Sequence, residues 1–240
     1  MFYLGISNSM QQEPYGEVFL LDKPLQWTSF DVVKKLRNTL KIKKVGHAGT
    51  LDPLATGLLI VCAGKMTKQI ESFMGQEKEY VGTFVLGSTT ESFDLEKPVY
   101  PVADPSHLKL HHIQDAVTQL TGAILQVPPM HSAIKIGGKR AYSAARKGEE
   151  LELQSRAVDV REFEITRFEQ GEVDFRISCS KGTYIRSLAR DLGQLLGVGA
   201  YLKSLRRTRI GSFTLEQAKN IEEVVEQVTA RENENLRRLS

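Results

Sequence analysis

The sequence predicts an α+β fold in which helices flank a mixed β-sheet. Runs in which apolar residues alternate, as they do in strands, are separated irregularly by segments with helical periodicity. Two alternating runs within residues 161–180 are joined at Gln170-Gly171, which indicates a hairpin. A hairpin and irregular spacing favour a mixed sheet over a doubly wound parallel one. We expect an arm over residues 1–15 and a single domain over residues 16–240.

The first half of this domain reads as strand, helix, loop and strand. Residues 16–24 (GEVFLLDKP) predict a strand that enters a turn. Residues 28–40 place valines and leucines on one helical face behind a Thr28 or Ser29 cap. Residues 45–57 predict a long irregular loop that leads into the apolar strand LLIVCAG. A helix over KMTKQIESFM and a strand over KEYVGTFVLG follow.

The second half begins with a helix around residues 107–121. Residues 127–150 are polar, basic and rich in turn residues, which predicts an extended surface element. After the hairpin, residues 182–197 form an amphipathic helix that ends at glycines. Residues 201–213 form a strand with several arginines, and a last helix ends in a charged tail that we expect to fray.

The composition is that of an ordinary globular protein. Hydrophobic residues make up 41% of the 240 residues, enough for one large core or two smaller ones, and the net charge of +3 permits an anionic partner. Cys62 and Cys179 both lie in apolar runs, and neither has the spacing of zinc ligands. Two cysteines are also too few for a disulfide scaffold. The start of the chain has no signal-peptide pattern and no apolar run is long enough to span a membrane, so we expect a cytoplasmic protein.

The loop from Gly46 to Gly57 contains the first candidate site residues. Glycines permit unusual backbone shapes and Pro53 stiffens the position after Asp52, so this loop could hold one carboxylate and the His47 imidazole in place. An ordinary turn, with Asp52 bonded to nearby amides and His47 on the surface, explains the loop equally well.

Arg186 and Tyr80 are candidates on regular elements. Arg186 opens a helix after a strand, and a guanidinium beside a half-buried Asp52 would lower the pKa of that carboxyl and keep it ionised. Tyr80, at the start of a strand, could stack on a base and offer its hydroxyl for proton transfer. The alternatives are a solvated helix arginine and a core aromatic ring.

Basic residues gather near the loop, the turn-rich segment and the arginine strand. Three clusters around such elements suit a phosphate backbone, although any one of them could be a solvated face. The clusters are Lys34, Lys35, Arg37, Lys41, Lys43 and Lys44; Lys135, Lys139, Arg140, Arg146 and Lys147; and Arg206, Arg207 and Arg209.

Taken together, these segments resemble the TruB family, the synthases that make pseudouridine at position 55 in the T-loop of tRNA. The resemblance runs from about Gly16 to Gly211, and the order of its motifs makes it specific. The motifs are Asp22–Ser29, Gly46–Gly57, Lys78-Glu79-Tyr80, Gly87–Asp94, Pro128–Lys135, Lys181–Arg186 and Leu205-Arg206-Arg207.

The resemblance implies a pseudouridine-synthase fold with a largely antiparallel sheet, and it implies roles for the candidates. Asp52 would be the essential aspartate, Arg186 its ion-pair partner, and Tyr80 the ring that stacks on the target uracil and helps to move a proton. His47 would contact the T-loop where the target base has left its stack.

Further residues would line the pocket or bind RNA. Tyr184 and Leu205 would line the pocket, and Lys23 with Pro24 would support its floor. A thumb-like insertion over about residues 124–150 would clasp the RNA. The basic residues implied in RNA contacts are Lys135, Arg140, Arg146 and Arg206.

The chain departs from the family pattern at two places. Gln26 stands where the family usually has glycine. Only about thirty residues follow Gly211, which is short for a domain, so we expect that the C-terminal PUA-type domain of many family members is absent.

The sequence therefore predicts an enzyme that isomerises one uridine of tRNA, binding the T-arm and T-loop as a monomer without a required protein partner. Because the reaction releases no atom except a proton, we expect no metal and no cofactor. The alternatives are a non-catalytic RNA-binding or tRNA-chaperone protein and a structural domain without a ligand.

Overall fold

The chain folds around a nine-stranded sheet whose strand order is β1-β3-β12-β4-β11-β10-β7, with β2 paired to β3 and β13 to β12. The computed structural model describes residues 16–130, 135–136, 139–140 and 153–239. The predicted arm over residues 1–15 lies outside them. The sheet strands are β1 (Gly16–Lys23), β2 (Val45–His47), β3 (Ala55–Gly64), β4 (Lys78–Leu86), β7 (Gly122–Gln126), β10 (Arg156–Glu169), β11 (Glu172–Cys179), β12 (Ala200–Ile210) and β13 (Phe213–Thr214).

The sheet is mixed and largely antiparallel, which confirms the predicted fold class. Its one parallel ladder joins β12 to β3, from Leu205 opposite Ala55 to Arg207 opposite Gly57. Gly57 has φ +100°, and a Cβ atom there would lie 2.3 Å from the carbonyl oxygen of Arg207. Glycine therefore allows the two strands to approach at the point where the candidate loop enters β3.

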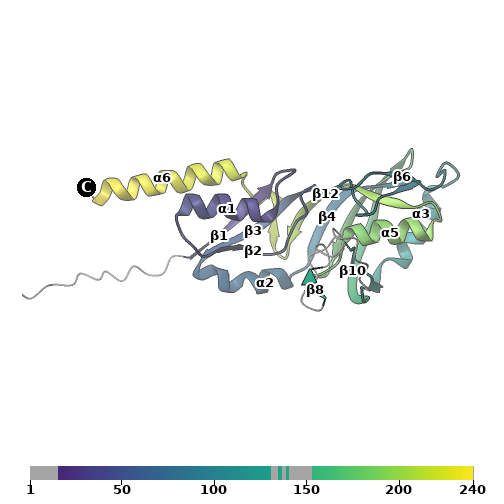
Figure 1. Ribbon diagram of the computed structural model, residues 1–240, viewed down its shortest axis with the longest axis horizontal. Helices are drawn as coiled ribbons and strands as arrows, with labels where there is room; N and C mark the ends of the chain where they lie inside the picture. Colours follow the sequence, from purple (N-terminus) through teal and green to yellow (C-terminus); the bar gives the residue numbers. More distant parts are fainter. Residues whose placement is uncertain (1–15, 131–134, 137–138, 141–152, 240) are drawn as a thin grey trace, which may run out of the picture.

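Five α-helices of the described chain cover the sheet (Figure 1). Each half of the sheet has its own core: α1 and α6 pack on β1 and β3, whereas α3 and α5 pack on the half that contains β4, β10 and β11. The helices are α1 (Ser29–Leu40), α2 (Ile70–Gly75), α3 (Leu110–Gln119), α5 (Ile185–Leu195) and α6 (Ile221–Leu239), with 3₁₀ turns at Lys65–Gln69 and Leu215–Gln217. No described helix is both long and apolar enough to cross a membrane.

Local signals placed several of these elements correctly. Thr28 caps α1: its hydroxyl accepts from the Asp31 amide at 3.1 Å, and the Asp31 carboxylate accepts from the Thr28 amide at 2.9 Å. The hairpin between β10 and β11 turns at Gln170 and Gly171, which both have positive φ.

Other boundaries differ from the prediction because long-range pairing sets them. The predicted irregular loop over residues 45–57 is shorter, since Val45–His47 pair with β3 and Ala55–Gly57 pair with β12. The tail that we expected to fray continues α6 to Leu239.

The predicted insertion over residues 124–150 begins later than expected, because residues 124–126 belong to β7 and pair with β10. Lys135 and Arg140 lie opposite each other in a two-stranded ladder formed by β8 (Lys135–Ile136) and β9 (Lys139–Arg140). Arg146 lies outside the described residues. Two further short strands, β5 (Ser88–Thr89) and β6 (Tyr100–Pro101), pair with each other.

Gln26, where the resemblance leads us to expect glycine, has φ +67°. A non-glycine residue pays about 1–2 kcal/mol in this region, and glycine loses about 0.5–1 kcal/mol more backbone entropy on folding. We therefore expect Gln26→Gly to raise the free energy of unfolding by about 0.5–1 kcal/mol, measured by urea denaturation.

The matched control is Gln114→Gly on the exposed face of α3, where we expect a loss of about 1 kcal/mol. A loss of stability in Gln26→Gly as large as in this control would contradict the strain at Gln26.

Candidate active site

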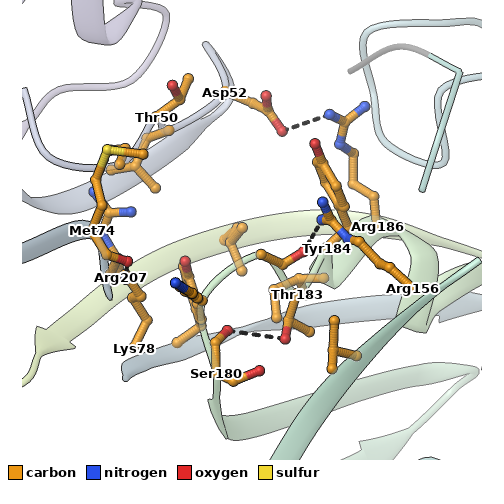
Figure 2. A pocket seen from close by; sticks show the side chains of 18 of the residues that line it. Thr50, Asp52, Met74, Lys78, Arg156, Ser180, Thr183, Tyr184, Arg186 and Arg207 are labelled. Carbon is orange, nitrogen blue, oxygen red and sulfur yellow. Dashed lines mark hydrogen bonds and ion pairs between the residues drawn. The ribbon is translucent and has the colours of Figure 1, made fainter. Parts of the chain in front are cut away.

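A cavity of about 870 Å³ opens where the β2–β3 loop, β4, β12 and the N-terminus of α5 meet (Figure 2). It is lined by Asp52, Tyr80, Tyr184, Arg186 and Leu205. Segments that are far apart in the chain thus bring five of the predicted site residues to one pocket.

The Asp52 loop is held by contacts from β1 and α1. The hydroxyl of Ser29, which is buried in the first turn of α1, accepts from the Leu51 amide at 2.9 Å and donates to the Leu51 carbonyl at 3.2 Å. The ammonium of Lys23 donates to the Pro53 carbonyl at 3.4 Å. The residues on either side of Asp52 are therefore tied to the body of the protein.

Arg186 points toward Asp52, as Figure 2 shows, with Nη2 2.9 Å from the Asp52 Oδ2 atom. Its side chain is only 4% exposed. It also donates to the Ser92 carbonyl at 3.2 Å, and its Nε lies 3.5 Å from Asp94. Asp94 in turn accepts from the Ser92 hydroxyl at 2.6 Å and from the Glu96 amide at 3.0 Å. The guanidinium is therefore fixed from behind as well as by Asp52.

The pKa of Asp52 differs from our expectation, because burial affects it more than Arg186 does. Burial raises the pKa of the carboxyl and is the largest effect; Arg186 and Lys23 lower this pKa, and Asp94 raises it further. The net pKa lies above the usual value for aspartate, although 38% of the side chain is exposed to the cavity. Arg186 thus limits the rise in pKa but does not reverse it.

Tyr80 is both a core residue and a pocket residue. It lies on β4, is 9% exposed, and belongs to the same hydrophobic cluster as Leu51 and Ala55 while it also lines the cavity. Burial raises the pKa of its phenol, and the charge of Arg207 acts in the opposite direction.

Tyr184 and Leu205 complete the pocket from α5 and β12. The side-chain amide of the buried Gln126 pairs with the Tyr184 backbone, accepting at 2.8 Å and donating at 3.1 Å. The Arg156 guanidinium lies 4.6 Å from the centre of the Tyr184 ring. Tyr184 is therefore held by its backbone, and its ring is covered by a cation.

The lysine and proline expected at the floor lie directly behind the Asp52 loop. Lys23 is fully buried, and its ammonium donates to the carbonyls of Pro24 at 2.9 Å and Trp27 at 2.5 Å. Burial lowers the pKa of Lys23 to about 8. Neither Lys23 nor Pro24 lines the cavity itself.

His47 and Arg206 also lie outside the cavity lining. His47 ends β2, and burial together with the Arg207 charge lowers the pKa of its imidazole. Arg206 is ion-paired with Asp22 at 2.6 Å and donates to the Thr56 hydroxyl at 3.2 Å. The side chains of Lys135 and Arg140 and the whole of Arg146 are outside the described part of the chain.

Among the lining or supporting residues that were not predicted as site residues are Lys78, Asp94 and Arg207. Alternation along a strand could have found two of them, because Arg207 lies two residues from Leu205 on β12 and Lys78 two residues from Tyr80 on β4. No local pattern predicts that Asp94 contacts Arg186. Within the described residues, no group of three or more His, Cys, Asp or Glu side chains is arranged to hold a metal ion.

Two family models match this chain. Residues 37–185 match the model of the TruB family pseudouridylate synthase N-terminal domain, and residues 186–239 match the tRNA pseudouridylate synthase B C-terminal domain. The second match contains β12, which pairs with strands of the first, so both matches share one sheet.

Curated relatives match over nearly their whole length. The tRNA pseudouridine synthase B of Parabacteroides distasonis is 50% identical over 215 residues, covering 87% of this chain and 92% of the relative. That of Flavobacterium johnsoniae is 50% identical over 221 residues, covering 88% and 96%.

Solved structures match over part of their length. A chain of a Cbf5-Nop10-Gar1 complex is 32% identical with a TM-score of 0.68, and the match covers 87% of this chain and 53% of that one. A chain of an H/ACA RNP bound to a substrate RNA containing 2'-deoxyuridine is 29% identical with a TM-score of 0.65, covering 87% and 52%. This chain therefore spans about half the length of these structural relatives.

The position of Arg186 between two carboxylates generates a stability prediction. Arg186→Met leaves Asp94 buried without its guanidinium, and we expect the free energy of unfolding to fall by about 3 kcal/mol at neutral pH. Urea denaturation measures this loss. The control is Arg176→Met, which breaks exposed pairs with Glu162 and Glu164 and should cost less than about 1 kcal/mol. Equal losses in the two variants would show that the buried pair contributes no more than a surface pair.

Proposed function

Because this chain belongs to the TruB family of pseudouridine synthases, we propose that it isomerises uridine to pseudouridine at position 55, in the T-loop of tRNA. The observation that carries this proposal is the ion pair between Asp52 and Arg186 inside a cavity that is also lined by the Tyr80 ring. Isomerisation of a displaced uracil needs three groups around it: a carboxylate, a guanidinium that aligns the carboxylate, and an aromatic ring.

The target base has to leave its stack before it can enter the cavity. Flipping a nucleotide costs a few kcal/mol, and stacking on an aromatic ring returns about 1–3 kcal/mol per base. In our proposal the Tyr80 ring stacks on the uracil, while His47 remains outside the cavity and fills the space that the base leaves in the T-loop. Tyr184 and Leu205 border the bound uracil.

The reaction breaks the bond between N1 of uracil and C1' of the ribose, turns the base, and joins C5 to C1'; the C5 proton is lost and N1 gains a proton. We propose that Asp52 is the essential carboxylate and acts in its ionised form, since only that form attacks or accepts a proton. Arg186 holds Asp52 in position, and the Tyr80 hydroxyl takes part in moving the proton.

RNA outside the pocket would be bound by basic residues. Our candidates for contacts with the T-arm phosphates are Lys135, Arg140 and Arg146 in the segment after β7, and Arg206 on β12. We propose that the chain acts in the cytoplasm as a monomer, without a cofactor and without a required protein partner.

The test is to incubate the protein with unmodified tRNA and to map pseudouridine by mass spectrometry. We expect one modified position, U55, with the wild-type chain. Asp52→Asn keeps the shape of the side chain but removes its charge, so tRNA affinity should stay within a few-fold while turnover is lost. Turnover by the Asn variant at a comparable rate would remove Asp52 from the chemistry, and tRNA binding without any modification by the wild type would favour a non-catalytic RNA-binding protein.

The raised pKa of Asp52 predicts the acid side of the pH profile. Activity needs the ionised carboxylate, so it is present above the folded-state pKa and is lost as pH falls through it. Because burial raises this pKa, the acid limb of kcat should lie above 3.8, the value of an ordinary aspartate. Single-turnover rates across the acid range measure the limb, with circular dichroism to verify folding at each pH. An acid limb at or below 3.8 in folded protein would contradict the assignment.

A further inference from the structure

Three buried cations around the cavity lack carboxylate partners. Lys23, Lys78 and Arg207 are 0%, 6% and 1% exposed. Within the described part of the chain none of them forms an ion pair, and their hydrogen bonds go to backbone carbonyls. Arg186, in contrast, lies between two carboxylates.

These cations are close enough to disfavour one another. Burial lowers the pKa of both Lys23 and Lys78 to about 8; the charge of Arg207 lowers both further, whereas Asp52 raises that of Lys23. Burying unpaired like charges is costly, and such arrangements are concentrated at functional sites.

Arg207 and Lys78 line the cavity on the side away from the Asp52–Arg186 pair, as Figure 2 shows. We call these two side chains the cationic wall. Arg207 is the direct cross-strand neighbour of Tyr80, and its guanidinium donates to the carbonyls of Leu58 at 2.7 Å and Gly49 at 3.1 Å. A uracil stacked on Tyr80 would therefore lie between the Asp52 carboxylate and the cationic wall.

We propose that Arg207, assisted by Lys78, stabilises the negative charge that collects on the uracil ring while it is detached from the ribose. This inference rests on the proposed function. When the N1–C1' bond breaks, its electron pair stays with the ring and spreads over N1 and the carbonyl oxygens. C5 then bonds to C1', the C5 proton is released, and N1 takes up a proton, so the product base is neutral.

The Asp52–Arg186 pair does not supply this stabilisation, and of the other cations in the lining Lys181 is exposed to solvent while Arg156 lies on the Tyr184 ring. Asp52 repels an anionic ring, and the charge of Arg186 is already compensated by Asp52 and Asp94. The cationic wall is preorganised, since its carbonyl partners hold it before the charge develops, and such fixed charges act strongly in a site from which water is excluded.

The experiment compares two RNA substrates, a T-arm hairpin with uridine at the target position and the same hairpin with 5-fluorouridine. Fluorine withdraws electrons and stabilises the uracil anion, so the fluorinated ring needs less help from the protein. We measure the single-turnover rate at which the target nucleoside is consumed and the RNA affinity for the wild type, Arg207→Met, Arg207→Lys and Lys78→Met. The matched control is Arg167→Met, a surface arginine paired with Asp174 outside the cavity.

We expect Arg207→Met to react about a hundredfold more slowly on uridine, with affinity changed only a few-fold. Its deficit on 5-fluorouridine should be several-fold smaller, Arg207→Lys should recover most of the rate, and Arg167→Met should equal the wild type. Lys78→Met should also lose less rate on 5-fluorouridine than on uridine, with a smaller loss on uridine than Arg207→Met shows. If Arg207→Met does not fold, Lys78→Met provides the test.

Equal deficits on the two substrates in a folded variant would overturn the proposal and leave these cations a structural role. A wild-type protein that converts no uridine would instead refute the proposed function. The two failures are therefore distinguishable.

Discussion

The ion pair between Asp52 and Arg186 joins a loop of one half of the sheet to a helix of the other, and the rest of the pocket is arranged around it. Each partner is fixed independently of the pair. Ser29 and Lys23 hold the backbone on both sides of Asp52, and the Ser92–Asp94 segment holds the guanidinium from behind. A pair whose partners are both preorganised requires little rearrangement when a substrate arrives, which is the condition for precise catalytic geometry.

Strand β12 brings the two halves together at this point. It pairs in parallel with β3, where Gly57 allows the close approach, and antiparallel with β4, which carries Tyr80. Because side chains alternate along a strand, Leu205 and Arg207 line the cavity while Arg206 pairs with Asp22. The same strand therefore supplies an apolar side chain and a buried charge to the pocket.

Elements whose signals are local could be predicted from the sequence. The Thr28 cap of α1, the hairpin at Gln170-Gly171 and the amphipathic helix α5 depend on residues a few positions apart. Three boundaries depend on pairing with strands that are distant in the chain, so no local pattern reveals them. They are the short strand β2, the start of β3 before its predicted position, and the start of the segment after β7 beyond its predicted position.

For the site, the sequence by itself determined the family resemblance and with it the candidates Asp52, Tyr80 and Arg186. Only the tertiary structure decided that Asp94 lies behind Arg186, that Arg207 rather than Arg206 faces the cavity, and that burial outweighs Arg186 in setting the pKa of Asp52. The physical reason is that strand register and desolvation depend on everything that surrounds a residue in space. Residue type and spacing along the chain do not determine strand register or desolvation.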